Sequence, residues 1–339
     1  MPTVDTIVVW GAGAIGGTVG AYLARAGHDV LFVDSAGDHV AAMNAGGIAI
    51  EGPIETFSVA APALSPEQLD GRFRRILLCV KAHHTAGAAA ALTPHLADDG
   101  FVASLQNGLN ERVIAAAVGE ARTIGAFVNF GADYLAPGRV LYGGRGAFVL
   151  GELDGARSER VTALAELARV MEPGAIVTDN IWGFLCGKLG YGALLFATAL
   201  TDDSIADVLD MAEYRPLLAA LAREVVAVCA AQHIRPEGFN GWDPTAFVPG
   251  APQSAADASF AAMVAFNRRS AKSHSGIWRD LAVRKRKTEV DAQLGPIVRE
   301  GGRLGLPTPL SARLIALVHD IEDGRRRLAR ETLDLLGAA

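Results

Sequence analysis

The stretch that most limits what this chain can fold into is residues 6–17, Thr-Ile-Val-Val-Trp-Gly-Ala-Gly-Ala-Ile-Gly-Gly. Apolar, β-favouring residues run directly into a Gly-x-Gly-x-x-Gly motif, and the residues up to Gly27 are typical of one helix. Gly11 permits a tight turn, Gly13 lets the backbone approach a pyrophosphate, and Gly16 lets the helix pack close to the strand. The phosphates then lie at the positive end of that helix. The stretch predicts a dinucleotide site formed by Gly11, Ala12, Gly13, Ala14, Ile15 and Gly16.

A second apolar strand, residues 30–33, ends in Asp34 at the spacing expected for a carboxylate that binds a ribose. Such a carboxylate accepts a hydrogen bond from the adenosine 2′-hydroxyl and repels a 2′-phosphate. Asp34 therefore favours NAD(H), with NADP(H) as the alternative cofactor. The competing interpretation of Asp34 is a turn or helix-capping acid, since Ser35 and Asp38 follow it closely.

Length and composition exclude several other classes of protein. The 339 residues suffice for two domains with sizeable cores, and the net charge of −6 gives no reason to expect nucleic acid or an anionic membrane as a partner. The three cysteines form no Cys-x-x-Cys pair, which fits a reducing compartment and argues against a metal site. No targeting segment is visible, so we expect a cytoplasmic protein. The one basic cluster, residues 284–287, is expected on a solvated helix face, with an anion contact as the alternative.

Up to about residue 150 apolar strands alternate with helices, the pattern of a parallel sheet covered on both faces. Two of these strands are followed by Lys81 and by Asn107. In open α/β sheets ligands bind at the carboxyl ends of the strands, where both residues fall. The second half of the chain has almost no strand pattern. We predict an α/β fold, with an N-terminal doubly wound Rossmann sheet in residues 1–176 and an all-α C-terminal domain in residues 177–339.

The most unusual stretch of the second half is residues 181–200, which is apolar and glycine-rich but carries Lys188 near its centre. About 20 apolar residues can cross a bilayer, but a central lysine and four glycines argue against a membrane span. A buried helix, in which glycines let a ligand or another backbone come close, fits better. Burying an unpaired charge is costly, so Lys188 is expected to be a catalytic or substrate-binding cation. The alternative is a lysine that reaches the surface from a helix end.

Several separate motifs resemble the ketopantoate reductase (2-dehydropantoate 2-reductase) family over nearly the whole chain. They are the loop Gly11–Gly16, Lys81-Ala82, Gln106-Asn107-Gly108, Pro137-Gly138, Lys188-Leu189, Thr288-Glu289-Val290-Asp291 and Gly305-Leu306-Pro307-Thr308-Pro309. The resemblance implies a Rossmann domain followed by a helical domain related to that of 6-phosphogluconate dehydrogenase, with the active site in the cleft between them. It also implies reduction of a 2-oxo acid to a 2-hydroxy acid by hydride from a nicotinamide.

The resemblance implies roles for single residues. Lys188 is expected to act as the general acid, Asn107 to contact substrate and cofactor, and Glu289 to bind near the nicotinamide ribose. Lys81 and Ala132 are expected to line the cofactor site. The chemistry fits, because hydride addition to a carbonyl leaves an alkoxide that a neighbouring cation stabilises and protonates.

The chain departs from the family pattern around the substrate. Family members carry substrate-binding asparagines about one and two turns after the lysine, where this chain has Gly192 and Phe196. These two positions are therefore expected to border the substrate. A match made without a gap on Trp182 would instead place Lys188 near an asparagine position.

Two further departures concern the substrate carboxylate and the cofactor. A family serine matches Ser275, whose hydroxyl could hold the acid's carboxylate. The spacing is a residue or two longer, so Ser273 and His274 are rivals. The second strand of family members usually ends in an arginine suited to NADP, where this chain has Asp34.

These observations predict an NAD(P)H-dependent reductase or dehydrogenase acting on a small 2-oxo or 2-hydroxy acid other than ketopantoate. Lys188, Asn107 and Glu289 are the expected catalytic residues. One alternative is true 2-dehydropantoate reduction, and another is dehydrogenation of a larger hydroxy acid or amino-acid conjugate. A nucleotide-sensing module without turnover is the alternative from another class. Helical domains of this kind often dimerise, so a homodimer is expected.

Overall fold

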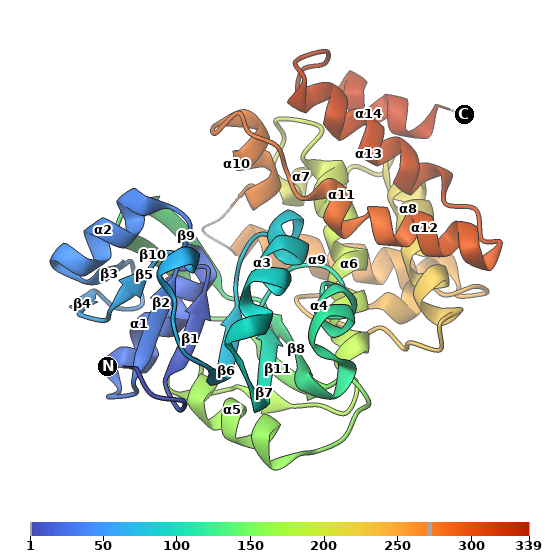
Figure 1. The fold of residues 1–339 in the computed structure, drawn as a ribbon. Coiled ribbons are helices and arrows are strands. Elements are labelled where there is room, and N and C mark those ends of the chain that lie inside the picture. Colours follow the sequence, from blue (N-terminus) through green and yellow to red (C-terminus); the bar gives the residue numbers. More distant parts are fainter. Residues whose placement is uncertain (1, 270–272, 339) are drawn as a thin grey trace. The chain divides into compact units, whose positions relative to one another are not determined.

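The computed structural model describes residues 2–269 and 273–338. The chain forms two compact units, Met1–Ile181 and Trp182–Ala339 (Figure 1). The boundary expected from the sequence, between residues 176 and 177, falls on a two-residue strand, β12 (Ile176–Val177), which pairs with the sheet of the first unit.

The first unit contains an eight-stranded sheet in the order β12-β11-β8-β7-β6-β1-β2-β5. Within the pairs that hold the sheet together, β11 runs antiparallel to β8 and the other neighbours are parallel. The other strands of this sheet are β1 (Ile7–Trp10), β2 (Val30–Val33), β5 (Ala63–Leu64), β6 (Phe73–Leu78), β7 (Leu96–Ser104), β8 (Thr123–Val128) and β11 (Phe148–Glu152). Its helices are α1 (Ala14–Arg25), α2 (Gly37–Gly46), α3 (Thr85–Leu92), α4 (Glu111–Val118) and α5 (Glu159–Arg169).

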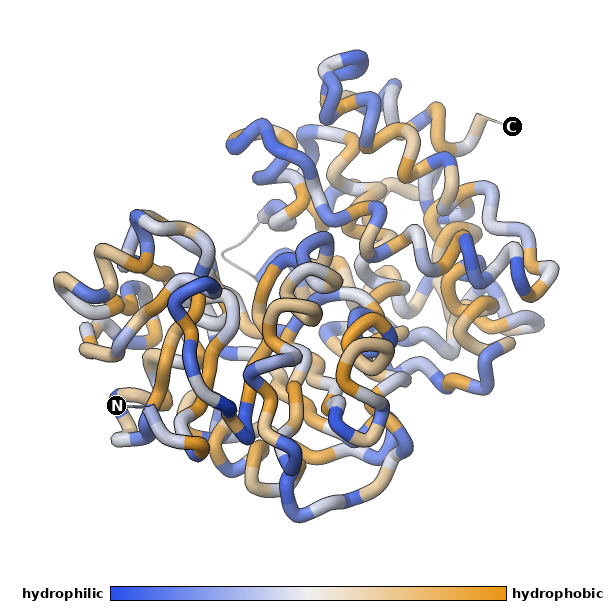
Figure 2. The backbone as a smooth tube through the Cα atoms, in the orientation of Figure 1, coloured by the Kyte–Doolittle hydropathy of each residue, from blue (hydrophilic) through white to orange (hydrophobic). Residues whose placement is uncertain are grey.

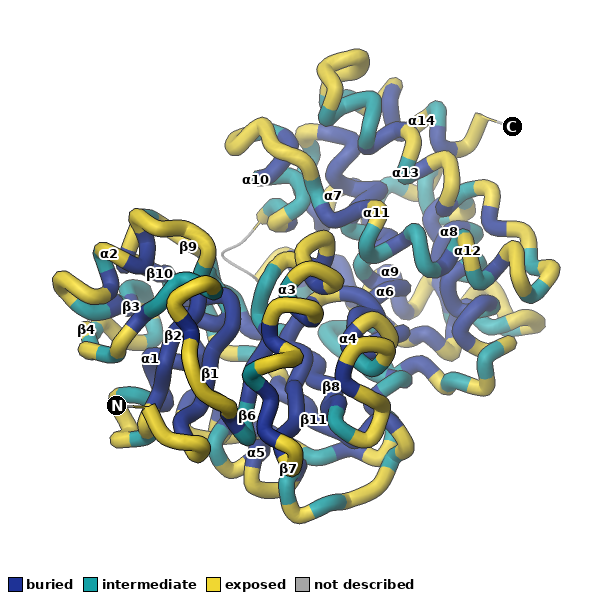
Figure 3. The backbone as a smooth tube through the Cα atoms, in the orientation of Figure 1, coloured by how far each residue is buried: buried dark blue, intermediate teal, exposed yellow. Residues whose placement is uncertain are grey.

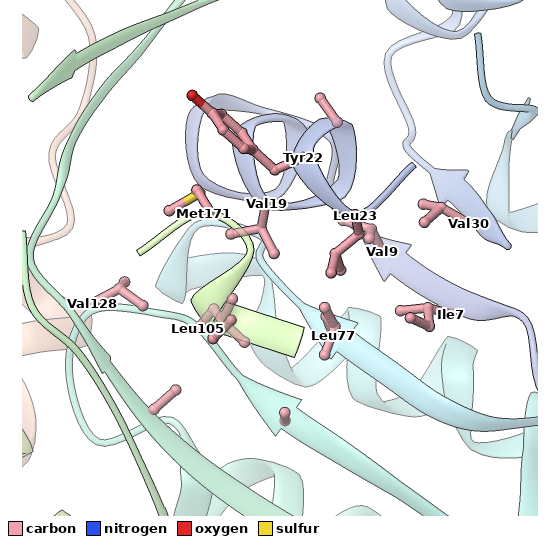
Figure 4. Packing of buried hydrophobic residues seen from close by; sticks show 14 of the residues in the cluster. Ile7, Val9, Val19, Tyr22, Leu23, Val30, Leu77, Leu105, Val128 and Met171 are labelled. Atoms are coloured by element: carbon pink, nitrogen blue, oxygen red, sulfur yellow. The ribbon is translucent and has the colours of Figure 1, made fainter. Parts of the chain in front are cut away.

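The apolar strands are buried on both faces, which explains why they carry no polar alternation. In β1, Ile7 and Val9 belong to one hydrophobic cluster, whereas Val8 and Trp10 belong to another on the opposite face. Figure 4 shows Val19 and Leu23 of α1 packed toward Val9 and Leu77 in the first cluster. Figures 2 and 3 show the same strands as apolar and buried. The predicted doubly wound sheet is confirmed.

A second sheet of four strands has the order β4-β3-β10-β9. Its strands are β3 (Ile48–Glu51), β4 (Phe57–Val59), β9 (Gly131–Ala136) and β10 (Arg139–Gly144). The turn at Pro137 and Gly138 joins β9 to β10, and Gly138 has a φ of +73°. Strand β3 was not predicted. It has four residues directly after two glycines, so its alternating burial is too short to outweigh the turn signal.

The alanine-rich stretch from His83 to Leu96 does not form one continuous helix. A 3₁₀ turn (Ala82–His84) precedes α3, and a second one (Thr93–His95) follows it. Pro94 has no N–H to continue the α-helical hydrogen bonds, so α3 ends before it and the chain turns through the second 3₁₀ turn into β7 at Leu96.

Among its described residues the second unit consists of helices and the segments that connect them, with one isolated bridge between Phe239 and Trp242. Helix α6 (Ile181–Thr198) starts at the boundary between the units. The other helices are α7 (Ile205–Asp210), α8 (Arg215–Ala230), α9 (Gln253–Arg269), α10 (Gly276–Ala282), α11 (Val290–Gln293), α12 (Gly295–Leu304), α13 (Pro309–Glu322) and α14 (Arg330–Gly337).

Helix α6 is long and apolar enough to span a membrane, but 72% of its 18-residue window is buried inside the protein. Its glycines make room for the proline-rich segment that follows α8. A Cβ atom on Gly187 would lie 2.0 Å from the carbonyl oxygen of Glu237, and one on Gly190 would lie 2.6 Å from the Trp242 ring. The expectation that glycines in α6 let another backbone come close is confirmed.

Candidate functional site

The glycine-rich loop lies between the carboxyl end of β1 and the start of α1. Gly11 has a φ of +96°, and a Cβ there would lie 2.8 Å from the backbone nitrogen of Val80 at the end of β6. A Cβ on Gly16 would lie 1.9 Å from the carbonyl oxygen of Gly11, so α1 can pack this close only without a side chain. By contrast, a Cβ on Gly13 meets no described atom within 4 Å. The three glycines thus meet the demands of a turn, a ligand-facing backbone and close helix packing.

The loop also sits at the point where the strand order reverses. The chain places β2 on one side of β1 and then returns to place β6 on the other side. Ligands of open α/β sheets bind at such a switch point, outside the carboxyl ends of the strands. No side chain among the described residues caps α1, so the N–H groups of its first turn are available to an anion.

Asp34 makes the contacts of a turn acid, and these contacts place it beside the glycine-rich loop. Its Oδ2 accepts a hydrogen bond from the backbone N–H of Ala12 at 2.7 Å, and its Oδ1 accepts one from Ala36 at 2.9 Å. The carboxylate is therefore both a turn acid and a fixed negative charge at the edge of the glycine-rich loop. The pKa of Tyr134 is raised by burial and then by the charges of Asp38 and Asp34. Residues 34–38 hold two acids and no base.

His39 is a residue of this site that the sequence analysis missed. It is buried in α2, where its Nδ1 accepts a hydrogen bond from the N–H of Gly138 at 2.9 Å. The proton is therefore on Nε2, which donates to the carbonyl oxygen of Ala12 at 2.9 Å. His39 thus ties the glycine-rich loop to the turn between β9 and β10. A lone histidine in a short amphipathic helix gives no sequence signal for this contact.

Lys81 and Asn107 lie beyond the carboxyl ends of β6 and β7, which are neighbours in the sheet, and both are exposed. A buried network of hydrogen bonds holds the backbone of Asn107 in place. Gln106 donates to Thr85 Oγ1 at 2.8 Å, Thr85 donates to Asn110 at 3.0 Å, and Asn110 donates to the carbonyl oxygen of Asn107 at 2.6 Å. The Asn107 amide is consequently left facing outward on a fixed backbone.

Ala132 lies in the second sheet, where it pairs with Tyr142 of β10 and packs against the larger hydrophobic cluster. The first unit therefore gathers the glycine-rich loop, Asp34, Lys81 and Asn107 at the carboxyl ends of four adjacent parallel strands. It places Ala132 on a strand outside that sheet.

In the second unit, Lys188 lies near the middle of α6 and is half-buried. Gly192, one turn further on, is also half-buried. Phe196 has no exposed surface, so a substrate would touch it only if its neighbours moved.

Glu289 precedes α11 and is 9% exposed, and the residues on both sides of it are held by α13. Glu322 Oε1 accepts hydrogen bonds from the backbone N–H of Thr288 at 2.6 Å and from its hydroxyl at 2.8 Å. His319 bridges Glu322, at 2.9 Å, and Asp291, at 3.0 Å. The turn that carries Glu289 is therefore fixed from both directions.

We expect this bridge to make stability depend on pH. Burial lowers the pKa of His319, but its hydrogen bonds to Glu322 and Asp291 outweigh burial and raise that pKa above the ordinary histidine value. Its contribution is then complete below about pH 6.5 and is lost as the pH rises through the raised pKa of the folded state. Urea unfolding should show that His319→Gln costs about 1 kcal/mol at about pH 6 and less at about pH 9. The exposed His233, replaced by asparagine, is the control, and a cost for His319→Gln that grows with pH would contradict the assignment.

Ser275 caps the N-terminus of α10, where its Oγ accepts a hydrogen bond from the N–H of Trp278 at 3.1 Å. Its hydroxyl proton can still be donated to a ligand, although the side chain is buried. The rivals Ser273 and His274 pair with each other at 2.9 Å, and His274 also contacts the carbonyl oxygen of Asp202 at 3.1 Å. Ser275 thus already has a local structural role.

An open groove of about 800 Å³ lies between the end of α10 and the segment that joins α13 to α14. Its lining includes Lys285, Arg286, Arg326 and Arg327 but none of the predicted site residues. The basic run 284–287 lies in a loop rather than on the expected helix face. Two of its arginines pair with Asp280, so part of its charge is structural.

Comparison with known proteins agrees with this arrangement. The family profile described as "Ketopantoate reductase PanE/ApbA" matches residues 7–155, and the profile described as its "C terminal" part matches residues 188–322. A curated protein of Mesorhizobium japonicum named 2-dehydropantoate 2-reductase is 32% identical over 248 residues, which are 66% of this chain and 75% of that protein.

Two solved structures have the same fold over nearly their whole length. A PanE/ApbA family ketopantoate reductase from Ralstonia eutropha JMP134 is 28% identical, with a TM-score of 0.78 over 95% of this chain and 100% of that one. The ternary structure of D-mandelate dehydrogenase with NADH and anilino(oxo)acetate has a TM-score of 0.80, 22% identity, and coverage of 94% of this chain and 98% of that one. This chain is an NAD(P)-dependent oxidoreductase acting on a CH–OH group, and it belongs to the ketopantoate reductase family.

Proposed function

We propose that this chain prefers NAD(H) and interconverts a small 2-oxo acid and the corresponding 2-hydroxy acid, with a substrate other than ketopantoate. The observation that carries the cofactor preference is the Asp34 carboxylate, held at the edge of the glycine-rich loop by the N–H of Ala12. Residues 34–38 include a second acid, Asp38, and no basic residue. A 2′-phosphate bound beside them would therefore find no positively charged partner in this segment. The D-mandelate dehydrogenase of similar fold was solved with NADH.

The residues of the first unit fit a nicotinamide dinucleotide. Gly13 leaves its backbone open to a pyrophosphate, the first turn of α1 offers N–H groups, and Asp34 offers acceptors to ribose hydroxyls. The bound nicotinamide supplies or takes the hydride at the substrate's C2 atom. Lys81 and Asn107 lie at the neighbouring strand ends, where their amino and amide groups can bind cofactor or substrate oxygens.

In this proposal Lys188 transfers the proton to and from the substrate oxygen. Hydride addition turns the substrate carbonyl oxygen into an alkoxide, and an ammonium group both stabilises that charge and donates a proton to the oxygen. In the reverse direction the neutral amine accepts the hydroxyl proton. A substrate other than ketopantoate is proposed because the face of α6 that follows Lys188 offers Gly192 and the buried Phe196, neither of which has a side-chain hydrogen-bonding group.

The test is to titrate the purified protein with NADH and NADPH in parallel by nicotinamide fluorescence, and then to assay a panel of 2-oxo acids that includes 2-dehydropantoate. Tighter NADH binding together with turnover of another 2-oxo acid supports the proposal. Tighter NADPH binding with 2-dehydropantoate as the best substrate overturns it and favours the reaction named for the Mesorhizobium relative.

Asp34→Asn should weaken NADH binding by about 10-fold and narrow the preference for NADH over NADPH, because a charged acceptor for the ribose hydroxyl is lost. Asp38→Asn is the matched control, since it removes the same charge from the adjacent first turn of α2. Fluorescence titration of both variants with both cofactors measures the effect. An unchanged NADH/NADPH affinity ratio in Asp34→Asn would show that this carboxylate does not contact the ribose.

A further inference from the structure

Gln293 is the last residue of α11, the helix that follows Glu289, and it lies beside Gly192 of α6, the helix that carries Lys188. Its side-chain Oε1 is 3.6 Å from the position that a Cβ atom would take on Gly192. Its backbone N–H donates to the carbonyl oxygen of Glu289 at 2.9 Å, so it follows Glu289 by one helical turn. Gly192 follows Lys188 by one turn in the same way. Residues four apart share a helix face, with their Cβ atoms about 5–6 Å apart. Gln293 is therefore close to the faces of both predicted catalytic residues.

The Gln293 amide has no hydrogen-bond partner within residues 2–269 and 273–338 of the structure, and its side chain is half-buried. The buried Gln106 of the first unit differs, because its Nε2 donates both to Val80 and to Thr85. A side-chain amide can donate two hydrogen bonds and accept two. The Gln293 amide thus holds an unused donor and acceptor pair beside Gly192.

Gly192 makes this placement possible. A Cβ at this position would meet only the Gln293 amide, at ordinary contact distance, and no other described atom within 4 Å. Any longer side chain at position 192 would take the space that the Gln293 amide now occupies. The glycine in α6 and the glutamine after Glu289 therefore form one structural feature, although they are about a hundred residues apart in the chain.

We propose that the Gln293 side-chain amide binds the carboxylate of the substrate and is a specificity-determining residue. The inference rests on the proposed function, in which Lys188 donates a proton to the C2 oxygen of a 2-oxo acid. Such an acid carries its carboxylate on the carbon next to the carbonyl. The Gln293 amide lies beside Gly192, which follows the proton donor Lys188 by one helical turn, so its N–H is in reach of that carboxylate and adds no charge.

The test compares Gln293→Ala and Gln293→Glu with the wild type, using the best substrate of the 2-oxo acid panel. Gln293→Ala should raise KM by about 10- to 100-fold and change kcat by less than about threefold, because a hydrogen bond to a charged group is lost in ground and transition states alike. Gln293→Glu should raise KM further, because it sets a negative charge against the carboxylate. NADH affinity should not change. Gln253→Ala, at an exposed glutamine of the same unit, is the control.

A rescue variant separates binding from a merely structural role. In the double variant Gly192→Asn with Gln293→Ala, the asparagine amide extends into the vacated space and should recover about 10-fold or more of the lost kcat/KM. A KM within about twofold of wild type in both single variants overturns the inference, as does a fall in kcat alone. A wild-type chain that reduces no 2-oxo acid overturns the proposed function and this inference together, whereas an active enzyme indifferent to Gln293 overturns only the inference.

Discussion

Replacing Lys188 by alanine is expected to lower kcat by about 100-fold or more, because the developing alkoxide loses both its counter-charge and its proton donor. The side chain extends from the middle of α6, whose backbone is packed against Glu237 and Trp242 at Gly187 and Gly190. Lys188 therefore starts from a rigid position. The rate of NADH oxidation with the best 2-oxo acid measures the effect.

Lys188→Arg separates the two roles of the amine. Arginine keeps the positive charge but does not release a proton at neutral pH, so KM should stay near the wild-type value while kcat remains low. Lys287→Ala, an exposed lysine in the loop before Thr288, is the control for loss of a charge from the same unit. A wild-type kcat in Lys188→Ala would show that Lys188 takes no part in the proton transfer.

Two alanine substitutions in the glycine-rich loop should have opposite consequences. In Gly13→Ala, the added Cβ meets no described atom of the protein but projects toward the proposed pyrophosphate site. Stability should be unchanged and NADH affinity should fall by up to about 100-fold, the equivalent of a 1–3 kcal/mol steric cost. In Gly16→Ala, the Cβ would lie 1.9 Å from the carbonyl oxygen of Gly11. This variant should be destabilised by about 1–3 kcal/mol or more, whether or not cofactor is present.

Urea unfolding and NADH titration of the same preparations check both outcomes. Gly37→Ala at the start of α2 is the matched control, since a Cβ there also meets nothing within 4 Å and no ligand contact is proposed for it. A Gly13→Ala variant that binds NADH normally would place the pyrophosphate elsewhere. A Gly16→Ala variant with wild-type stability would show that α1 can move away from β1 at no cost.

The elements that the sequence predicted well share a physical cause. Strands β1 and β2 are buried on both faces, so each appears as a short, uninterrupted apolar run, and β2 was predicted to the residue. The position of Lys81 and Asn107 at neighbouring strand ends was predictable for a related reason, because parallel strands bring their carboxyl ends to one edge. Strand β3 was missed since only Ile48 and Ile50 mark its buried face.

The residues that were missed depend on contacts between distant parts of the chain. His39 acts through Ala12 and Gly138, and Gln293 acts through its position beside Gly192. Local periodicity carries no information on either pair. Ser275 was noticed in the sequence, but its role was not predictable. A serine at the start of a helix is suited both to capping and to ligand binding, and the sequence does not distinguish the two roles.

The hydrogen bonds of His39 have a consequence for the order in which the protein can be completed during synthesis. The glycine-rich loop, Asp34 and His39 all leave the ribosome within the first forty residues, but the N–H that fixes the histidine ring belongs to Gly138, 99 residues after it. A nascent chain that stops before the turn between β9 and β10 therefore contains the whole nucleotide fingerprint without one of its supports. The loop gains this support only when β9 and β10 have emerged and paired, so we expect the nucleotide site of the first unit to be completed late in synthesis.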